Sequence, residues 1–112
     1  MKVVAICNQK GGVGKTTITL GLASAAVASG VRTLVIDMDS QGNASDALLA
    51  DLETPPEVTS YDVLLGKRGC APAAIAESPW GVGVIAGSLD LASFERSNAL
   101  ASEQRLRAGL AE

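Results

Sequence analysis

The chain has 112 residues, of which 47% are hydrophobic, and its formal net charge is −3 with no histidine. A chain of this size forms one domain with a sizeable core, and its acidic balance argues against a general nucleic-acid-coating surface. The lack of histidine excludes histidine-based catalysis, and no apolar run approaches the ~18 residues of a membrane span. Cys7 and Cys70, without a secretory signal, favour free thiols in a reducing, cytoplasmic compartment.

The first part of the chain reads as strand, loop, helix and strand. Lys2–Ile6 is a short apolar run that predicts a strand buried on both faces. Residues 15–29 are apolar around much of a helical circumference, which predicts a largely buried helix ending at Gly30. Thr33–Asp37 predicts a second strand. This order and spacing predict a βαβ unit with parallel strands and a right-handed crossover.

Shorter elements are expected later in the chain. Three helical pieces, a strand and a final helix are predicted, in that order, over Ala44–Leu52, Ser60–Leu65, Pro72–Ala76, Val82–Ala86 and residues 95–111. Ser60 is expected to cap its helix, and Gly66 to end it. Trp80 is expected to pack near the third strand. Pro55-Pro56 excludes regular helix from a loop that is too short to separate two domains.

The most specific signal lies between the first strand and the first helix, in Asn8-Gln9-Lys10-Gly11-Gly12-Val13-Gly14-Lys15-Thr16-Thr17. A strand, a glycine-rich loop and a helix are the context of a nucleotide phosphate-binding loop. Glycines let successive N–H groups turn toward an anion, and the helix N-terminus adds partial positive charge. Lys15 is placed to reach the β- and γ-phosphates, and the Thr16 hydroxyl to bind Mg²⁺. A plain glycine-rich turn would explain the glycines, but not two lysines and two threonines at these positions.

A second polar cluster, Asp37-Met38-Asp39-Ser40-Gln41-Gly42-Asn43, closes the second predicted strand. Ligands of open parallel sheets bind at the carboxyl ends of the strands, so this cluster and the phosphate loop should converge. An acid that ends an apolar run is costly to bury unless it meets a cation or hydrogen-bond donors. A Mg²⁺-nucleotide would supply the cation. Helix capping or simple strand termination is the plain alternative for both acids.

The phosphate loop departs from the strict G-x-x-x-x-G-K-[ST] pattern, because Gln9 replaces the first glycine and Lys10 heads the loop. In this form it resembles the deviant phosphate loop of the ParA/MinD superfamily of partition ATPases. D-x-D-x-Q-G-N is similar to that family's switch I segment, although Ser40 departs from the usual proline. The resemblance implies an α/β fold of the P-loop type, a parallel sheet with flanking helices. It covers all 112 residues, but only the first 43 carry specific motifs.

The resemblance also implies a role for each matching residue. Asp39 matches the acid that positions or activates the attacking water, and Asp37 is placed to reach the Mg²⁺ shell. Lys10 matches the signature lysine that reaches the partner subunit's nucleotide in an ATP-bound dimer. Lys15 and Thr16 match the phosphate lysine and the Mg²⁺ ligand. Further backbone or hydroxyl contacts fall on Gly11, Gly12, Val13, Gly14 and Thr17.

The family has a further strand, which ends in a second acid on the Mg²⁺ side, soon after a helix like the one expected over residues 95–111. This chain stops at Glu112. We therefore expect residues 1–112 to be the amino-terminal part of a single P-loop ATPase domain. The missing strand should lie between the two motif-bearing strands, which predicts an open gap, self-association or a rearranged sheet. Base-recognition segments are also expected later than this chain.

These observations favour a Mg²⁺-ATP-dependent switch of the ParA type that acts in plasmid or chromosome partition. ATP would drive homodimerisation through Lys10, and hydrolysis through Asp39 would reset the switch. In the longer protein the resemblance implies a partition partner protein and non-specific DNA as further partners. Two alternatives stay open: a MinD-like cell-division positioning ATPase, and a non-catalytic nucleotide-binding or dimerisation module. Loss of the second acid predicts weak or absent turnover by the isolated chain.

Overall fold

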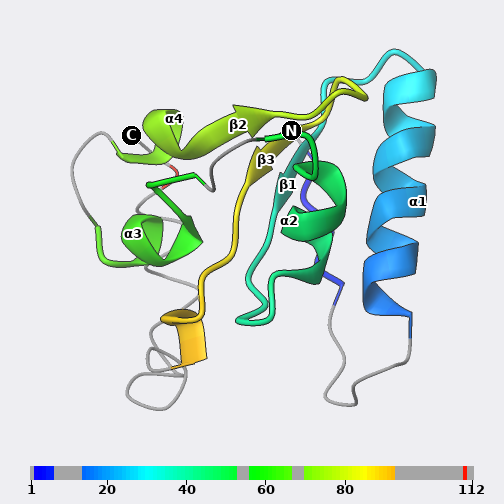
Figure 1. The fold of residues 1–112 in the computed structure, drawn as a ribbon. Helices are drawn as coiled ribbons and strands as arrows, with labels where there is room; N and C mark the ends of the chain where they lie inside the picture. The colour runs from blue at the N-terminus through cyan, green and yellow to red at the C-terminus, as the bar shows by residue number, and fades with distance from the viewer. Residues whose placement is uncertain (1, 7–13, 53–55, 67–69, 93–109, 111–112) are drawn as a thin grey trace.

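The computed structural model describes residues 2–6, 14–52, 56–66, 70–92 and 110. Within these ranges the elements run, in chain order, α1 (Lys15–Ala28), β1 (Leu34–Ile36), α2 (Asn43–Leu48), α3 (Ser60–Leu64), α4 (Cys70–Ala74), β2 (Ile75–Glu77) and β3 (Gly83–Ile85). The strands form one sheet in the order β1-β3-β2 (Figure 1). β1 pairs parallel with β3, and β2 pairs antiparallel with β3.

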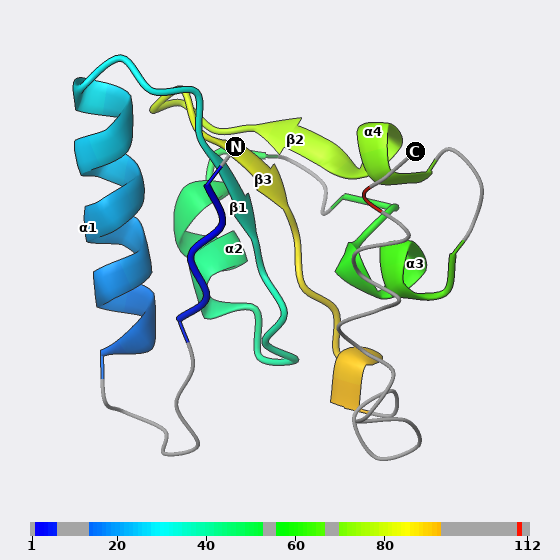
Figure 2. The same ribbon diagram turned by 180° about the vertical axis from the view of Figure 1, so that it is seen from behind.

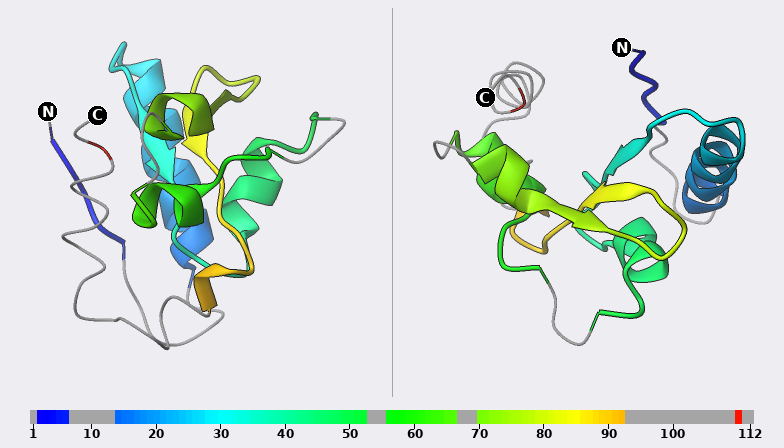
Figure 3. Two further views of the ribbon diagram at one scale, coloured as in Figure 1. Left: turned by 90° about the vertical axis from the view of Figure 1, so that its left-hand side faces the viewer. Right: turned by 90° about the horizontal axis from the view of Figure 1, so that it is seen from above.

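The sheet carries apolar side chains on both faces, in the alternation that a strand imposes. On one face Val35 and Val84 pack with Ala23 of α1 and Leu48 of α2. On the other face Ile85 and Ile36 pack with residues of α3, α4 and the segment before α3. Figure 3 shows α1 and α2 on a different side of the sheet from α3 and α4. The central strand β3 is thus buried on both faces, whereas β1 and β2 at the sheet edges are partly exposed.

Helix α1 confirms the predicted helix but not its predicted burial. Its end has Schellman geometry: the Gly30 N–H donates to the Val27 carbonyl at 2.9 Å, and Gly30 has a φ of +79°. Ala23 is its one buried residue. Ile18 and Leu22 are each 52% exposed, so the prediction of a largely buried helix is wrong. The sheet and α2 cover a single stripe of the helix, and no other described element packs against the opposite side.

The prediction of a buried first strand is also wrong. Lys2–Ile6 forms no strand, and Val3 and Val4 are 82% and 73% exposed. A strand needs a neighbour about 4.8 Å away, and no described strand pairs with this segment. The predicted βαβ pairing is therefore not formed in the described part of the chain. Instead β1 lies at the sheet edge and takes β3 as its parallel neighbour.

The later elements follow the predictions with three corrections. The cap of α3 is Thr59 rather than Ser60, in a capping box with Asp62. The segment predicted as one helical turn over Pro72–Ala76 divides into α4 and the unpredicted strand β2. The helix expected over Ala44–Leu52 ends earlier, since α2 stops at Leu48. The predicted helix over residues 95–111 lies outside the described residues, apart from residue 110, which is helical.

No helix within the described ranges is long and apolar enough to cross a membrane.

Candidate functional site

The start of α1 has the features of an anion site. Gly14 precedes the helix with a φ of +86°, a backbone conformation that favours glycine, and its carbonyl accepts the Ile18 N–H at 2.9 Å. The first turn contains no acidic residue, and no described side chain caps it. Backbone N–H groups in a first helical turn lack partners within the helix. This end of α1 therefore suits a bound anion such as a phosphate.

Asp37 lies at the carboxyl end of β1 and is 5% exposed. Its Oδ1 accepts the Asp39 N–H at 3.0 Å. Its Oδ2 accepts the Ser45 N–H at 3.0 Å and the Ser45 hydroxyl at 2.5 Å. Both oxygens of this buried carboxylate therefore take hydrogen bonds from the chain itself, which offsets the cost of burying it.

Asp39 heads the turn that leads into α2. Its Oδ1 accepts the Gln41 N–H at 2.9 Å, and its carbonyl accepts the Gly42 N–H at 3.0 Å. Asp39 is half-buried, and Gln41 is exposed. Gly42 has a φ of +66° and stands at the N-cap of α2. The Asp39 carboxylate is thus held at the rim of the turn rather than inside the core.

Three residues of this region were missed by the sequence analysis. The Gly87 N–H donates to Ser45 Oγ at 2.9 Å, and Ser60 Oγ donates to the Asp37 carbonyl at 2.7 Å. Gly87 follows β3, and Ser60 begins α3. The glycine flanking the third predicted strand was visible in the sequence. The sequence predicted Ser60 only as a helix cap and did not indicate that either serine bonds to Asp37, because Asp37 lies 8 and 23 residues away from them along the chain.

The ribbon places the N-terminus of α1 and the segments that follow β1 and β3 at the same end of the sheet (Figures 1 and 2). Lys15 and Thr16 are half-buried at the start of the helix, and Thr17 is exposed. The predicted contacts Lys10, Gly11, Gly12 and Val13 lie outside the described residues. The described part of the site therefore consists of the α1 start and the Asp37–Asp39 turn.

The described residues can bind a magnesium nucleotide only through a few protein ligands to the ion. Among them, no group of three or more histidine, cysteine or acidic side chains could hold a metal ion. Mg²⁺ at nucleotide sites keeps several waters and binds through few protein ligands and the phosphates themselves. The Thr16 hydroxyl in the first turn of α1 suits that mode, with Asp37 and Asp39 after β1 at the same end of the sheet.

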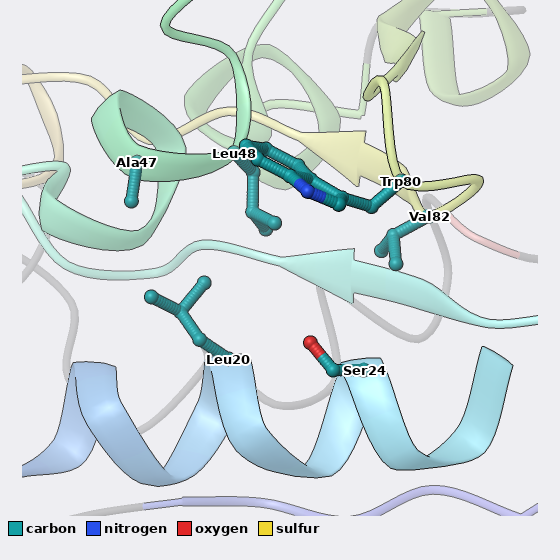
Figure 4. A pocket seen from close by; sticks show the side chains of 6 residues that line it. All are labelled: Leu20, Ser24, Ala47, Leu48, Trp80 and Val82. Atoms are coloured by element: carbon teal, nitrogen blue, oxygen red, sulfur yellow. The ribbon is translucent and has the colours of Figure 1, made fainter. Parts of the chain in front are cut away.

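A separate cavity of about 260 Å³ lies between α1, α2 and the turn that joins β2 to β3. Figure 4 shows Leu20 and Ser24 of α1 on one side, with Leu48 and Trp80 on the other. Trp80 is 58% exposed, so it packs only in part, near the third strand as expected. The cavity has no charged side chain in its lining. Its lining shares no residue with the first turn of α1 or the Asp37–Asp39 turn.

Comparison with known proteins identifies the family. A family model described as AAA domain matches residues 1–112. Chromosome partitioning protein ParA of Caulobacter vibrioides is 44% identical over 95 residues, covering 85% of this chain and 35% of that protein. The chain belongs to the ParA/MinD superfamily. Sporulation initiation inhibitor protein Soj of Bacillus subtilis is 36% identical over 94 residues, covering 84% of this chain and 37% of Soj.

Solved structures share the fold of this chain. Cobyrinic acid a,c-diamide synthase from Mycobacterium smegmatis with bound ADP and magnesium has a TM-score of 0.79 at 32% identity, covering 94% of this chain and 43% of that one. A plasmid partition protein from Borrelia burgdorferi shares the fold, with a TM-score of 0.78 at 24% identity, covering 95% of this chain and 47% of that one. The α/β fold of the P-loop type is thereby confirmed. The chain spans less than half the length of each of these four proteins.

Proposed function

We propose that the chain forms the phosphate- and magnesium-binding part of a ParA-type ATPase switch that acts in partition. The observation that carries this proposal is that the α1 N-terminus and the Asp37–Asp39 turn lie at the same end of the sheet (Figure 2). The ParA relative, named as a chromosome partitioning protein, supports the partition role. The ADP and magnesium bound by a structural neighbour support the ligand.

Phosphoryl transfer asks a protein for positioning and for charge neutralisation rather than for covalent chemistry. The first-turn N–H groups of α1 and the Lys15 ammonium bind the phosphates, and the Thr16 hydroxyl holds Mg²⁺. Mg²⁺, when bound, neutralises phosphate charge. Asp39 orients the attacking water from the rim of its turn. Asp37 stabilises that turn by accepting the Asp39 N–H and the Ser45 N–H. Lys10 reaches the nucleotide of the second subunit, so ATP favours a homodimer and hydrolysis releases it.

The same proposal covers the rest of the protein. Residues 1–112 belong to the amino-terminal part of a single P-loop ATPase domain that works in the cytoplasm, with a partition partner protein and DNA as further contacts. A MinD-like positioning ATPase is the alternative within the superfamily. A non-catalytic nucleotide-binding module is the second candidate function. The hydrogen bonds that occupy both Asp37 oxygens favour it, because they give this acid a structural role.

Calorimetric titration with a non-hydrolysable ATP analogue and Mg²⁺ tests the proposal. Lys15→Ala should weaken binding by more than tenfold, since a hydrogen bond to a charged group contributes about 1.5–3 kcal/mol. Lys2→Ala is the matched control, because it removes the same charge from an exposed position outside the site. Equal affinity of the Lys15→Ala and Lys2→Ala variants would show that the α1 start is not the phosphate site.

A further inference from the structure

We infer that Gly87 and Ser45 are positioning residues for Asp39, and that the segment after β3 thereby sets the geometry of the turn between β1 and α2. The geometric part of this inference stands on the structure alone. Its consequence for nucleotide chemistry rests on the proposed function. Neither residue belongs to a phosphate-loop or switch motif, and each acts through atoms that hold Asp37 or Asp39.

Gly87 packs directly against the turn. A Cβ added there would lie 2.7 Å from the Asp39 carbonyl oxygen, 3.2 Å from Asp37 Cγ and 3.4 Å from the Asp37 carbonyl oxygen. The φ of Gly87 lies outside the positive region, so space rather than backbone conformation requires glycine here. The atoms it meets belong to backbone and to a short, hydrogen-bonded side chain. They cannot swing aside as the end of a long side chain would. Any side chain at position 87 must therefore displace the carbonyl that closes the Asp39 turn.

Ser45 of α2 forms hydrogen bonds both to the end of β1 and to the segment after β3. Its hydroxyl donates to Asp37 Oδ2 and therefore uses a lone pair to accept the Gly87 N–H at 2.9 Å. Ser45 is 7% exposed, so water competes little for these bonds. One side chain of α2 thus connects the acid at the end of β1 to the backbone after β3.

Two further contacts fix the turn from the side of α3. Ser60 donates its hydroxyl to the Asp37 carbonyl and its N–H to the Ala86 carbonyl, at 2.7 and 2.8 Å. Met38, between the two acids, packs against a small cluster formed by Leu64 and Leu91, each 1% exposed. The turn that carries Asp39 is thus held by the ends of β1 and β3 and by the start of α3. A shift of the segment after β3 must move Asp39 with it.

The test compares Gly87→Ala with Gly83→Ala in the 112-residue chain. Gly83 lies four residues earlier in the same strand region, and its added Cβ would meet the side-chain ends Ile75 Cγ2 and Leu34 Cδ1 at 3.3 and 3.4 Å. The primary readout is amide hydrogen exchange measured by NMR. It is expressed as the ratio of the Asp39 exchange rate to that of Val84 in the sheet core. We expect Gly87→Ala to raise this ratio at least tenfold, and Gly83→Ala to change it less than threefold. Equal ratios in the two variants would overturn the inference.

A second variant guards against failure of Gly87→Ala to fold. Ser45→Ala adds no atoms and removes only the bridge, and it should also raise the Asp39 ratio. Its matched control is Ser78→Ala, because Ser78 is likewise 7% exposed and its hydroxyl accepts the Val82 N–H in the turn that joins β2 to β3. An unchanged Asp39 ratio in the Ser45→Ala variant would contradict the positioning role independently of Gly87.

The functional readout uses ADP with Mg²⁺, alone and with aluminium fluoride as a mimic of the transferred phosphoryl group. Gly87→Ala should lower affinity for the fluoride complex at least tenfold and change affinity for ADP less than threefold. Equal losses for both would mean that Gly87 acts on the whole site and not through Asp39, which would overturn the functional consequence. If the unmodified chain binds neither ligand, the proposed function fails, and the exchange ratios still decide the positioning role.

Discussion

Replacing Ser45 by alanine tests the hydrogen-bond network at the end of β1 through stability alone. The change removes one oxygen atom from a buried position and leaves the α2 helix otherwise intact. It deprives Asp37 Oδ2 of its shortest hydrogen bond, at 2.5 Å, and the Gly87 N–H of an acceptor at 2.9 Å. Two buried or half-buried groups therefore lose a partner in a single substitution.

The expected loss of free energy of unfolding follows from these two bonds. A hydrogen bond to a charged group contributes about 1.5–3 kcal/mol, and a neutral one about 0.5–1.5 kcal/mol. Asp37 keeps the N–H groups of Asp39 and Ser45, and Gly87 is only half-buried, so water can partly replace the lost acceptor. We therefore expect a loss near the lower end of the sum, about 2–3 kcal/mol.

Urea denaturation followed by circular dichroism measures this loss, with the fluorescence of Trp80 as a second probe. Ser78→Ala is the matched control. Ser78 is equally buried, but its replacement removes only one neutral hydrogen bond, of 3.2 Å. The free energy of unfolding should therefore fall by about 1 kcal/mol. A loss below about 0.5 kcal/mol for Ser45→Ala, or a loss equal to that of Ser78→Ala, would refute the reasoning that Ser45 supports a buried charge.

Three further outcomes are expected. Gly21→Ala should raise the free energy of unfolding by up to about 1 kcal/mol in urea denaturation, because Gly21 lies within α1 and an added Cβ meets nothing within 4 Å. Thr59→Ala should lower it by about 1 kcal/mol by removing the capping box with Asp62, and an unchanged denaturation midpoint would contradict this. In the longer protein Asp39→Ala should abolish ATP hydrolysis and spare ATP binding. A binding defect as large as that of Lys15→Ala, measured by calorimetry, would show that Asp39 has been given the wrong role.

The parts of the fold that the sequence predicted are those with local causes. Helix α1 ends at Ala28, just before Gly30, because a residue with positive φ closes it, and glycine is the residue that adopts this conformation most readily. Strands β1 and β3 lie within short apolar runs of the sequence next to turn-forming residues, and these runs predicted them. The fold class followed from the order of these elements and from the family resemblance.

The parts that the sequence did not predict depend on distant partners. Strand β2 is only three residues long and begins directly after α4, so it has no alternation long enough to read. Its residues become a strand because β3 offers an edge to pair with. The apolar run over Lys2–Ile6 shows the reverse: the strand pattern is present, but no described strand pairs with it. Strand propensity is a statement about a fitting neighbour as much as about the residues themselves.

In the candidate site, too, some features could be predicted from the local sequence, and others depend on distant partners. The sequence identified Asp37 as an acid that burial would penalise unless it met a cation or donors, and the structure supplies the donors from Asp39 and Ser45. The two acids of D-x-D therefore have different surroundings although they are two residues apart. Asp37 is buried and bonded through both oxygens, whereas Asp39 stands half-buried at the rim. Asp37 thus stabilises the turn through its hydrogen bonds, and Asp39 is the acid of the pair that stays partly accessible.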